Sequence, residues 1–278
     1  MFFPEPASIV LLLVTGIAVG FGQGLLGVGG SFIMVPVMVG VFTGMDLSTD
    51  LAVKLAFGTT LAVAFTTAIG SSLAHHRRGA VWWKAAVALG LAGAAGALLG
   101  STVTSRYIHG DSLKVAFGAV VILSVLRLIT ARPPVARGKP RDSVPLWAAC
   151  GFPLGFVSGL IGIGGGILMI PLLTSILKFR VHLAVGTSVG VILFTSSAGA
   201  LGYIVNGLDV GGLPDYSIGY LHLPSWVCLA ATSVAMTGLG ARVAHRLNAR
   251  VLMTVFIILM LYLGLRMIGV FDWLGWPI

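Results

Sequence analysis

Two glycine-rich segments, near copies of each other, carry the residue types best suited to chemistry in this sequence. Gly20–Pro36 reads GFGQGLLGVGGSFIMVP and Gly155–Pro171 reads GFVSGLIGIGGGILMIP, at a constant offset of 135 residues. Glycine allows backbone conformations with positive φ and lets a ligand come close to the main chain. When such a turn opens a helix, the first N–H groups lack intrahelical partners, and their partial positive charge favours a bound anion. The pattern therefore predicts an anion site at two broken helices.

The candidate ligands in these segments are main-chain glycine amides and the polar side chains beside them. They are Gln23, Gly27, Gly29, Gly30 and Ser31 in the first copy, and Ser158, Gly162, Gly164, Gly165 and Gly166 in the second. In the alignment Gln23 and Ser31 stand opposite Ser158 and Gly166, so the two copies differ chemically. The alternative is that the glycines only permit close packing of helices.

A second repeated motif follows each glycine-rich segment. Lys54–Thr60 reads KLAFGTT and His182–Ser188 reads HLAVGTS, at an offset of 128 residues, and each is expected about one turn into a helix. Its hydroxyls either bind substrate oxygens or donate to a carbonyl of their own helix. These hydroxyls belong to Thr59, Thr60, Thr187 and Ser188. The hydroxyls two turns further along, in Thr66, Thr67, Thr195, Ser196 and Ser197, are expected to pack or to join helices by hydrogen bonds.

Lys54 and His182 are equivalent positions of this motif, and both are ionisable residues at the ends of apolar segments. Such residues are functional candidates. A cation at each entrance would attract an anion and could act as a gate; the alternative is a charge that reaches out to interfacial water. Histidine is the side chain that ordinarily changes its charge near neutral pH, so proton coupling at His182 stays open.

The elements that position these residues are membrane-spanning helices. The chain has 278 residues, of which 57% are hydrophobic and only 9% charged, against about 25% charged in a soluble domain. This composition excludes a water-soluble enzyme, and tryptophans at the segment ends are typical of an aromatic belt. A helix needs about 20 apolar residues to span a bilayer. The apolar runs are 7–42, 51–74, 81–104, 113–130, 146–177, 183–205, 223–240 and 251–270.

The placement of Lys and Arg selects a topology, because cytoplasmic loops are enriched in these residues. If each glycine-rich segment enters and returns as a hairpin of two short helices, 13 of the 17 basic residues fall on one face. If each crosses once, there is no bias. The hairpin model gives five segments per half, an odd number. We therefore expect an all-α polytopic membrane protein with two inverted-topology repeats, both termini being outside.

The domain organisation follows from the same pattern. We expect a first membrane repeat over residues 1–130, a basic cytoplasmic linker over 131–145, and a second membrane repeat over 146–278. The N-terminal segment has no basic region before its apolar run, so it is expected to belong to the fold rather than to a cleaved signal peptide.

The glycine-rich segments and the two KLAFGTT-type motifs resemble the TauE/SafE sulfite exporter family, also called the 4-toluene sulfonate uptake permease family. The resemblance rests on Gly20–Met38, its copy Gly159–Leu173 and the motifs KLAFGTT and HLAVGTS, and it covers nearly the whole chain. It implies a multi-pass transporter of the bacterial cytoplasmic membrane for sulfonates such as sulfoacetate, or for sulfite. The family is credited with both export and uptake.

Other functions find less support in the residues. The GxGxxG-like pattern at Gly22–Gly27 lies in a membrane segment without a βαβ context, and no Walker motif is present. The carboxylates fall in loops or tails, which favours an anionic substrate over a cation. We expect no cofactor, no metal and no nucleic acid; the partners are a small organosulfur anion and membrane lipid. A coupling proton or sodium ion and a homo-oligomer stay open, as do a passive anion channel and, less favoured, a membrane-embedded enzyme or an assembly subunit.

Overall fold

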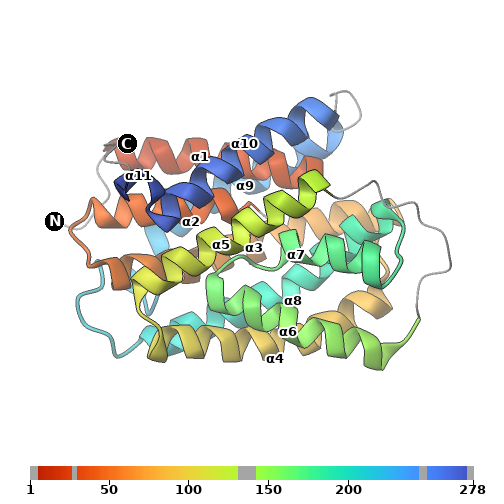
Figure 1. Ribbon diagram of the computed structural model, residues 1–278, viewed down its shortest axis with the longest axis horizontal. Helices are drawn as coiled ribbons and strands as arrows, with labels where there is room; N and C mark the ends of the chain where they lie inside the picture. The colour runs from red at the N-terminus through yellow and green to blue at the C-terminus, as the bar shows by residue number, and fades with distance from the viewer. Residues whose placement is uncertain (1–5, 27–29, 131–141, 244–248, 274–278) are drawn as a thin grey trace.

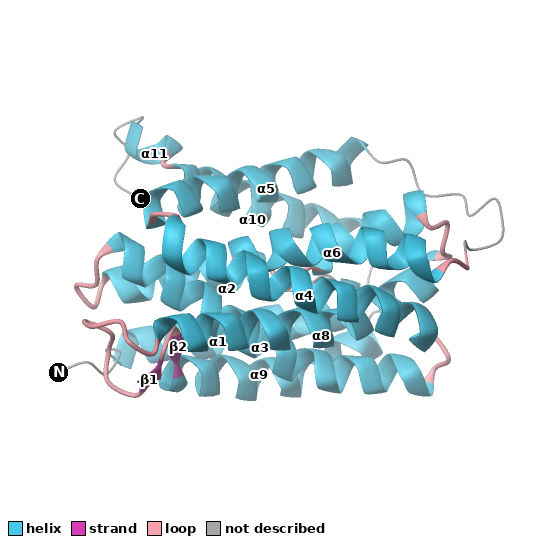
Figure 2. Ribbon diagram, turned by 90° about the horizontal axis from the view of Figure 1, so that it is seen from below, coloured by secondary structure: helices cyan, strands magenta, loops and turns pink. Residues whose placement is uncertain are grey.

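The computed structural model describes residues 6–26, 30–130, 142–243 and 249–273, and almost all of them are helical (Figures 1 and 2). Two short strands, β1 and β2, form an antiparallel pair. The elements are α1 (Pro6–Leu26), α2 (Ser31–Thr43), α3 (Thr49–Arg77), α4 (Trp83–Tyr107), α5 (Gly110–Thr130), α6 (Val144–Ile161), α7 (Gly166–Pro171), the π-helical turn η1 (Leu172–Ile176), α8 (Val181–Gly207), β1 (Ser217–Ile218), β2 (Leu221–His222), α9 (Leu223–Val243), α10 (Ala249–Ile268) and α11 (Val270–Trp273).

Six of the described helices are long and apolar enough to cross a membrane. In lipid every backbone polar group must be paired within the protein, and a helix does this without help from its neighbours. Val10, Leu91 and Val205 are among the large apolar side chains exposed on these helices, as expected for a surface that faces acyl chains. The prediction of an all-α polytopic membrane protein is confirmed.

The connections between the helices gather at two opposite ends of the bundle (Figures 1 and 2). The loops 44–48, 108–109 and 208–222 lie at the end where both termini are marked, which we call the terminus end. The loops 78–82, 142–143 and 177–180 lie at the other end, which we call the linker end. Hydrogen bonds join loops within each end, from Gly110 N to Asp50 Oδ1 at the first and from Lys84 Nζ to Asp142 Oδ1 at the second.

The first glycine-rich segment divides two helices of unequal length. α1 runs through Gly20, Gly22 and Gly24 as far as Leu26, so it is long enough to cross a membrane, and only α2 is short. The hairpin of two short helices is thus wrong in its first helix, because single glycines are tolerated in membrane helices whose neighbours pack closely. Gly20 illustrates this, since a β-carbon there would collide with the main chain of Ser233 in α9.

The second glycine-rich segment has the same plan with a more irregular short arm. α6 has 18 residues, and the short arm consists of α7 followed by η1. Pro171 ends α7, and a proline lacks the N–H that a regular α-helix needs there, so a local π-helical turn is a reasonable consequence. In both halves a helix long enough to span a membrane is thus followed by a short helix that runs back.

Helices of the two halves pack against each other. α1 packs against α9, and α6 packs against α4. In the second pair Gly155 lies on the carbonyl of Gly93, so closely that any side chain on Gly155 would collide with it. α5 contacts α10, and in Figure 1 α5 runs from the terminus end to the linker end whereas α10 runs the opposite way. α1 and α6 are likewise drawn in opposite directions.

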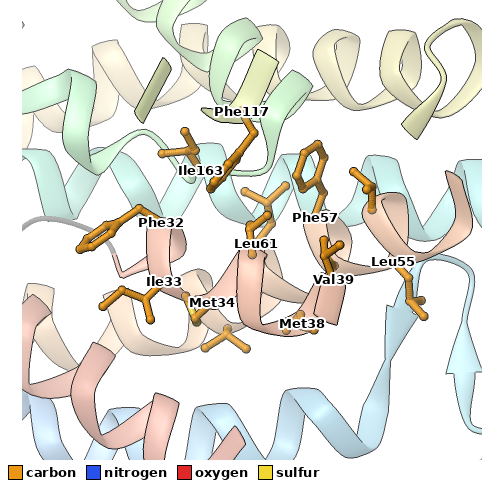
Figure 3. Packing of buried hydrophobic residues seen from close by; sticks show 14 of the residues in the cluster. Phe32, Ile33, Met34, Met38, Val39, Leu55, Phe57, Leu61, Phe117 and Ile163 are labelled. Carbon is orange, nitrogen blue, oxygen red and sulfur yellow. The ribbon is translucent and has the colours of Figure 1, made fainter. Parts of the chain in front are cut away.

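The main apolar cluster joins the short helix of the first half to the break in the second. Phe32 and Met38 of α2 pack with Phe57 and Leu61 of α3, and Ile163 reaches the same cluster from the second break (Figure 3). The short helix α2 and the break before α7 therefore share one apolar core.

Candidate functional site

The second break turns on glycines with left-handed backbone conformations. Gly162, Gly164 and Gly165 have φ values of 67°, 70° and 85°, which side-chain-bearing residues adopt at a cost. α7 begins directly afterwards at Gly166, with no side chain capping its first N–H groups. The turn therefore brings main-chain amides into the interior of a membrane protein at a place where no side chain of its own covers them.

Three serine hydroxyls surround this turn, and each comes from a different helix. A β-carbon placed on Gly164 would lie 3.0 Å from Ser196 Oγ of α8 and 3.7 Å from Ser31 Oγ of α2. A β-carbon on Gly165 would lie 3.6 Å from Ser158 Oγ of α6. The start of α2 and the turn before α7, which are far apart in the sequence, therefore meet at one place.

All three hydroxyls are fully buried and lack a protein partner. Ser31, Ser158 and Ser196 have no exposed surface, and their Oγ atoms form no hydrogen bond within the described part of the chain. Buried polar groups are normally paired, and leaving one unpaired costs about 1–3 kcal/mol. Three such groups around one glycine turn indicate a place prepared for a ligand or for water. We call Ser31, Ser158, Gly164, Gly165 and Ser196 the central cluster.

The central cluster offers neutral donors. A serine hydroxyl donates one hydrogen bond, and a main-chain N–H at the start of a helix donates another. Thr195 also reaches the turn, donating from Oγ1 to the Gly164 carbonyl at 3.4 Å and to carbonyls of its own helix. Among the described residues there is no group of three or more His, Cys, Asp or Glu side chains that could hold a metal ion. This chemistry suits the oxygen atoms of a small anion.

The other glycine-segment candidates are distributed around this cluster. Gln23, which is 2% exposed, has a buried Nε2 without a partner. Gly30 precedes α2 and faces the side chain of Val19, and Gly162 faces the ring of Phe57. Gly166 is buried at the start of α7. The predicted ligands Gly27 and Gly29 lie outside the described residues.

The glycine of each KLAFGTT-type motif receives the main chain of a loop. A β-carbon on Gly58 of α3 would collide with the carbonyl oxygen of Tyr220, and one on Gly186 of α8 would collide with that of Ala80. In both motifs the absence of a side chain is what allows the loop to lie against the helix. Gly58 is also nine residues into α3, deeper than the single turn that the sequence predicted.

The threonine after each glycine completes the same contact. Thr59 Oγ1 accepts the N–H of His222 at 3.0 Å, and Thr187 Oγ1 accepts the N–H of Trp82 at 3.1 Å. Each motif thus holds a carbonyl and, two residues later, an N–H of the loop before α9 or α4. We call these two sets of contacts the loop docks: Gly58 and Thr59 with Tyr220 and His222, and Gly186 and Thr187 with Ala80 and Trp82. The loop residues of the two docks are 140 residues apart, which is also the spacing between Gly100 of α4 and Gly240 of α9.

The hydroxyls of these motifs already have protein partners. Thr59 also donates to the Leu55 carbonyl, and Ser188 donates to the Val185 carbonyl. Thr60 Oγ1 lies 3.5 Å from the sulfur of Met38. In this conformation the four hydroxyls therefore differ from those of the central cluster, which are unpaired.

Lys54 and His182 lie at opposite ends of the bundle. Lys54 Nζ is 2.8 Å from Asp50 Oδ2, and the lysine side chain is only 8% exposed. Asp50 also accepts the N–H of Gly110, which ties α3 to α5 at the terminus end. His182 is exposed near the start of α8, at the linker end. The structure does not bring either residue to the central cluster.

Two further residues of α8 lie at the central glycine turn. Thr195 and Ser196 were expected to pack or to join helices by hydrogen bonds, and neither was predicted as a ligand. A signal was available, because Ser196 lies eight residues after Ser188 and therefore on the same face of α8. Trp147 was assigned to an interfacial belt, but it is fully buried and packs edge-on against Trp82, with ring centroids 5.3 Å apart.

Comparisons with known proteins agree with this architecture. The family model of the sulfite exporter TauE/SafE matches residues 12–267. A probable membrane transporter protein of Methanocaldococcus jannaschii is 30% identical over 240 residues, covering 86% of this chain and 88% of the relative. Probable membrane transporter proteins of Haemophilus influenzae and Bacillus subtilis are each 28% identical, over 93% and 95% of this chain and 97% and 100% of their own lengths. No solved structure matches the chain.

Proposed function

The chain belongs to the sulfite exporter TauE/SafE family of multi-pass membrane transporters, and we propose that it carries small sulfur-containing anions across the cytoplasmic membrane. The proposed substrates are sulfonates such as sulfoacetate, or sulfite. The proposed mode of action is secondary transport without catalysis, in which the anion is held at the starts of the two short helices.

One observation carries this proposal, namely the central cluster. Ser31, Ser158 and Ser196 present three unpaired buried hydroxyls around two adjacent left-handed glycines. A sulfonate or sulfite group has three oxygen atoms that accept hydrogen bonds and a single charge or two to neutralise. Neutral donors and the positive ends of helices hold such a group without a buried cation, whose strong binding would slow release.

The proposed mechanism is alternating access around this cluster, with the two halves related as inverted repeats. Support comes from the exchange of packing partners between the halves, α1 with α9 and α6 with α4, and from the opposite directions of α5 and α10. Inverted repeats with broken helices place a substrate site near the membrane midplane. The basic loops put the linker end in the cytoplasm and the terminus end outside.

Ligand-dependent thermal stability of the purified protein tests the site directly. Sulfite, sulfoacetate, taurine, an aryl sulfonate, sulfate and acetate are added separately, and a ligand that binds only the folded state raises the melting temperature. We expect a selective rise with a sulfur anion, and its loss in Ser196→Ala. Ser197→Ala is the matched control, because Ser197 Oγ donates to the Phe194 carbonyl of its own helix at 3.0 Å. No rise with any of these anions, in protein shown to be folded, would contradict the proposal.

A further inference from the structure

His222 is a fully buried histidine at the terminus end, at the point where a loop becomes α9. Its main-chain N–H is held by Thr59 of α3, and its ring meets that of Phe42 edge-on, with centroids 5.4 Å apart. Tyr220, two residues earlier, lies against Gly58 and donates its N–H to the Tyr203 carbonyl at 3.4 Å. His222 thus closes the terminus end by joining α2, α3 and α9.

The hydrogen bonds of the ring define its protonation state in this conformation. His222 Nδ1 lies 3.4 Å from the N–H of Ser225, the third residue of α9, and 2.8 Å from Ser225 Oγ. A main-chain N–H can only donate, so Nδ1 accepts and caps the helix, and the neutral ring carries its proton on Nε2. Nε2 is buried and has no partner among the described residues. Ser217, the opposite residue on β1, also has a buried hydroxyl with no partner in this part of the chain.

A second proton on this ring would be opposed by two effects. It would go to Nδ1, so Nδ1 could no longer accept the Ser225 N–H, and the cap would be lost. It would put a positive charge at the positive end of the α9 dipole. Protonation of the ring therefore disfavours the docked arrangement of the loop.

The surroundings of the ring provide no compensating charge. The titratable or charged side chains near this end on the elements packed against it are Asp50 and Lys54 of α3, Tyr203 of α8 and Cys228 of α9, with Tyr220 in the turn between the strands. Asp50 and Lys54 pair with each other. Burial alone lowers the pKa of His222 from 6.5 to about 4, and burial also raises the pKa of Tyr220.

We propose that His222 is a proton-binding site that controls the opening of the terminus end. The neutral ring caps α9 and keeps the loop on α3. When the loop leaves α3, water reaches both ring nitrogens, a proton binds at Nδ1, and the imidazolium holds that end open. This inference rests on the proposed transport function and names the proton as the ion that regulates it.

Hydrogen exchange tests the opening without any substrate. With a closed-state pKa of about 4 and an ordinary value of 6.5 in the open state, a pH of about 5 favours opening about 20-fold more than neutral pH does. We expect the amides of residues 216–223 in purified protein to open that much more often at about pH 5, after correction for intrinsic rates. His222→Asn removes this dependence, because asparagine caps a helix without titrating.

Two controls accompany this measurement. His109→Asn replaces an exposed histidine that precedes α5 at the same end, and it is expected to behave like the unaltered protein. The segment 79–82 docks on α8 through the equivalent contacts and has no titratable side chain of its own, with His75, His76 and Arg78 before it. None of these residues is altered, so at each pH its opening is expected to be the same in all three proteins. Equal acid-induced opening of residues 216–223 in His222→Asn, or none in the unaltered protein, would overturn the proposal.

Exchange of a labelled aryl sulfonate in liposomes, with equal pH on both sides, links the site to transport. The aryl sulfonate keeps its charge across this range, so any pH dependence belongs to the protein. We expect faster exchange at about pH 5 than at neutral pH, and a pH-independent rate in His222→Asn. If the unaltered protein moves no sulfonate, the proposed substrate fails while hydrogen exchange still decides the role of His222. If it exchanges sulfonate and His222→Asn keeps the same acid response, the role of His222 fails and the transport function stands.

Discussion

The two loop docks of this protein use the same contacts but end in different side chains. At the linker end Gly186 and Thr187 hold Ala80 and Trp82, and at the terminus end Gly58 and Thr59 hold Tyr220 and His222. The two docks differ at their last residue. Trp82 begins α4 without a side-chain cap, whereas His222 caps α9 with its ring.

The neighbours of these two residues differ in the same way. Trp82 packs against Trp147 and Phe179, with ring centroids 5.3 and 5.2 Å away, in a purely aromatic contact. His222 has one aromatic neighbour, Phe42, and a polar contact to Ser225. Duplication has therefore preserved the main-chain contacts of each dock, while the side chains have diverged so that His222 stands where the other dock has Trp82.

The largest expected effect is the loss of either dock glycine. Gly58→Ala and Gly186→Ala each place a methyl group on a loop carbonyl, so the loop must move away, and each should lower the unfolding free energy by about 2–4 kcal/mol. The melting temperature in detergent measures this. Gly40→Ala is the control, because a β-carbon there meets nothing within 4 Å. A dock glycine that tolerates alanine as well as Gly40 does would break the equivalence of the two docks.

Acid should weaken the dock at the terminus end through His222. The folded-state pKa of His222 is lowered to about 4, so its contribution is complete above the ordinary pKa of 6.5 and is lost as the pH falls toward 4. The expected loss is about 1–3 kcal/mol, since each unit of pKa shift corresponds to about 1.4 kcal/mol. The difference in melting temperature between the unaltered protein and His222→Asn, followed against pH, measures it. A difference that does not change between pH 6.5 and 4 would contradict this assignment.

The dock threonines should contribute equally at the two ends. Thr59→Val and Thr187→Val keep the shape of the side chain but remove the acceptor of a loop N–H, at about 1–2 kcal/mol each. Thermal unfolding of both variants at neutral pH makes the comparison. A cost confined to one of them would show that only one motif functions as a dock.

The ion pairs at the two ends should contribute least, and unequally. Lys84 and Asp142 at the linker end are 58% and 50% exposed, so Lys84→Met should change the unfolding free energy by less than about 0.5 kcal/mol. Lys54 is nearly buried beside Asp50, and Lys54→Met should cost about 1 kcal/mol. Melting temperatures at low and high salt compare the two pairs. A larger loss of stability in Lys84→Met than in Lys54→Met would contradict the role of burial.

Much of the fold could be predicted from the sequence because membrane helices are selected by composition. The apolar runs, the duplication and the two glycine breaks are local patterns, and the helices follow them closely. The length of the first helix was not predictable, because Gly20, Gly22 and Gly24 look like helix breakers until the contact of α1 with α9 is known. Tertiary packing thus decided which glycines break a helix.

The central cluster was only half predictable, for a different reason. Ser31 and Ser158 belong to the glycine segments, so their repeat position indicated them, but Ser196 joins them from α8 through the packing of the two halves. The role of Thr59 was ambiguous in the sequence, since a threonine hydroxyl can serve its own helix, a substrate or a distant loop. Its partner, the N–H of His222, is 163 residues away, and no local pattern indicates such a contact.

The most direct test of the account is counterflow of a labelled sulfonate into liposomes that contain the purified protein and are preloaded with the unlabelled anion. A carrier with its site in the central cluster predicts transient, saturable accumulation that Ser197→Ala keeps and Ser196→Ala reduces at least about tenfold, the effect of about 1.4 kcal/mol. Equal counterflow in the two variants would contradict a substrate site at Ser196. Linear flux that follows the membrane voltage and shows no counterflow would identify a passive anion channel instead.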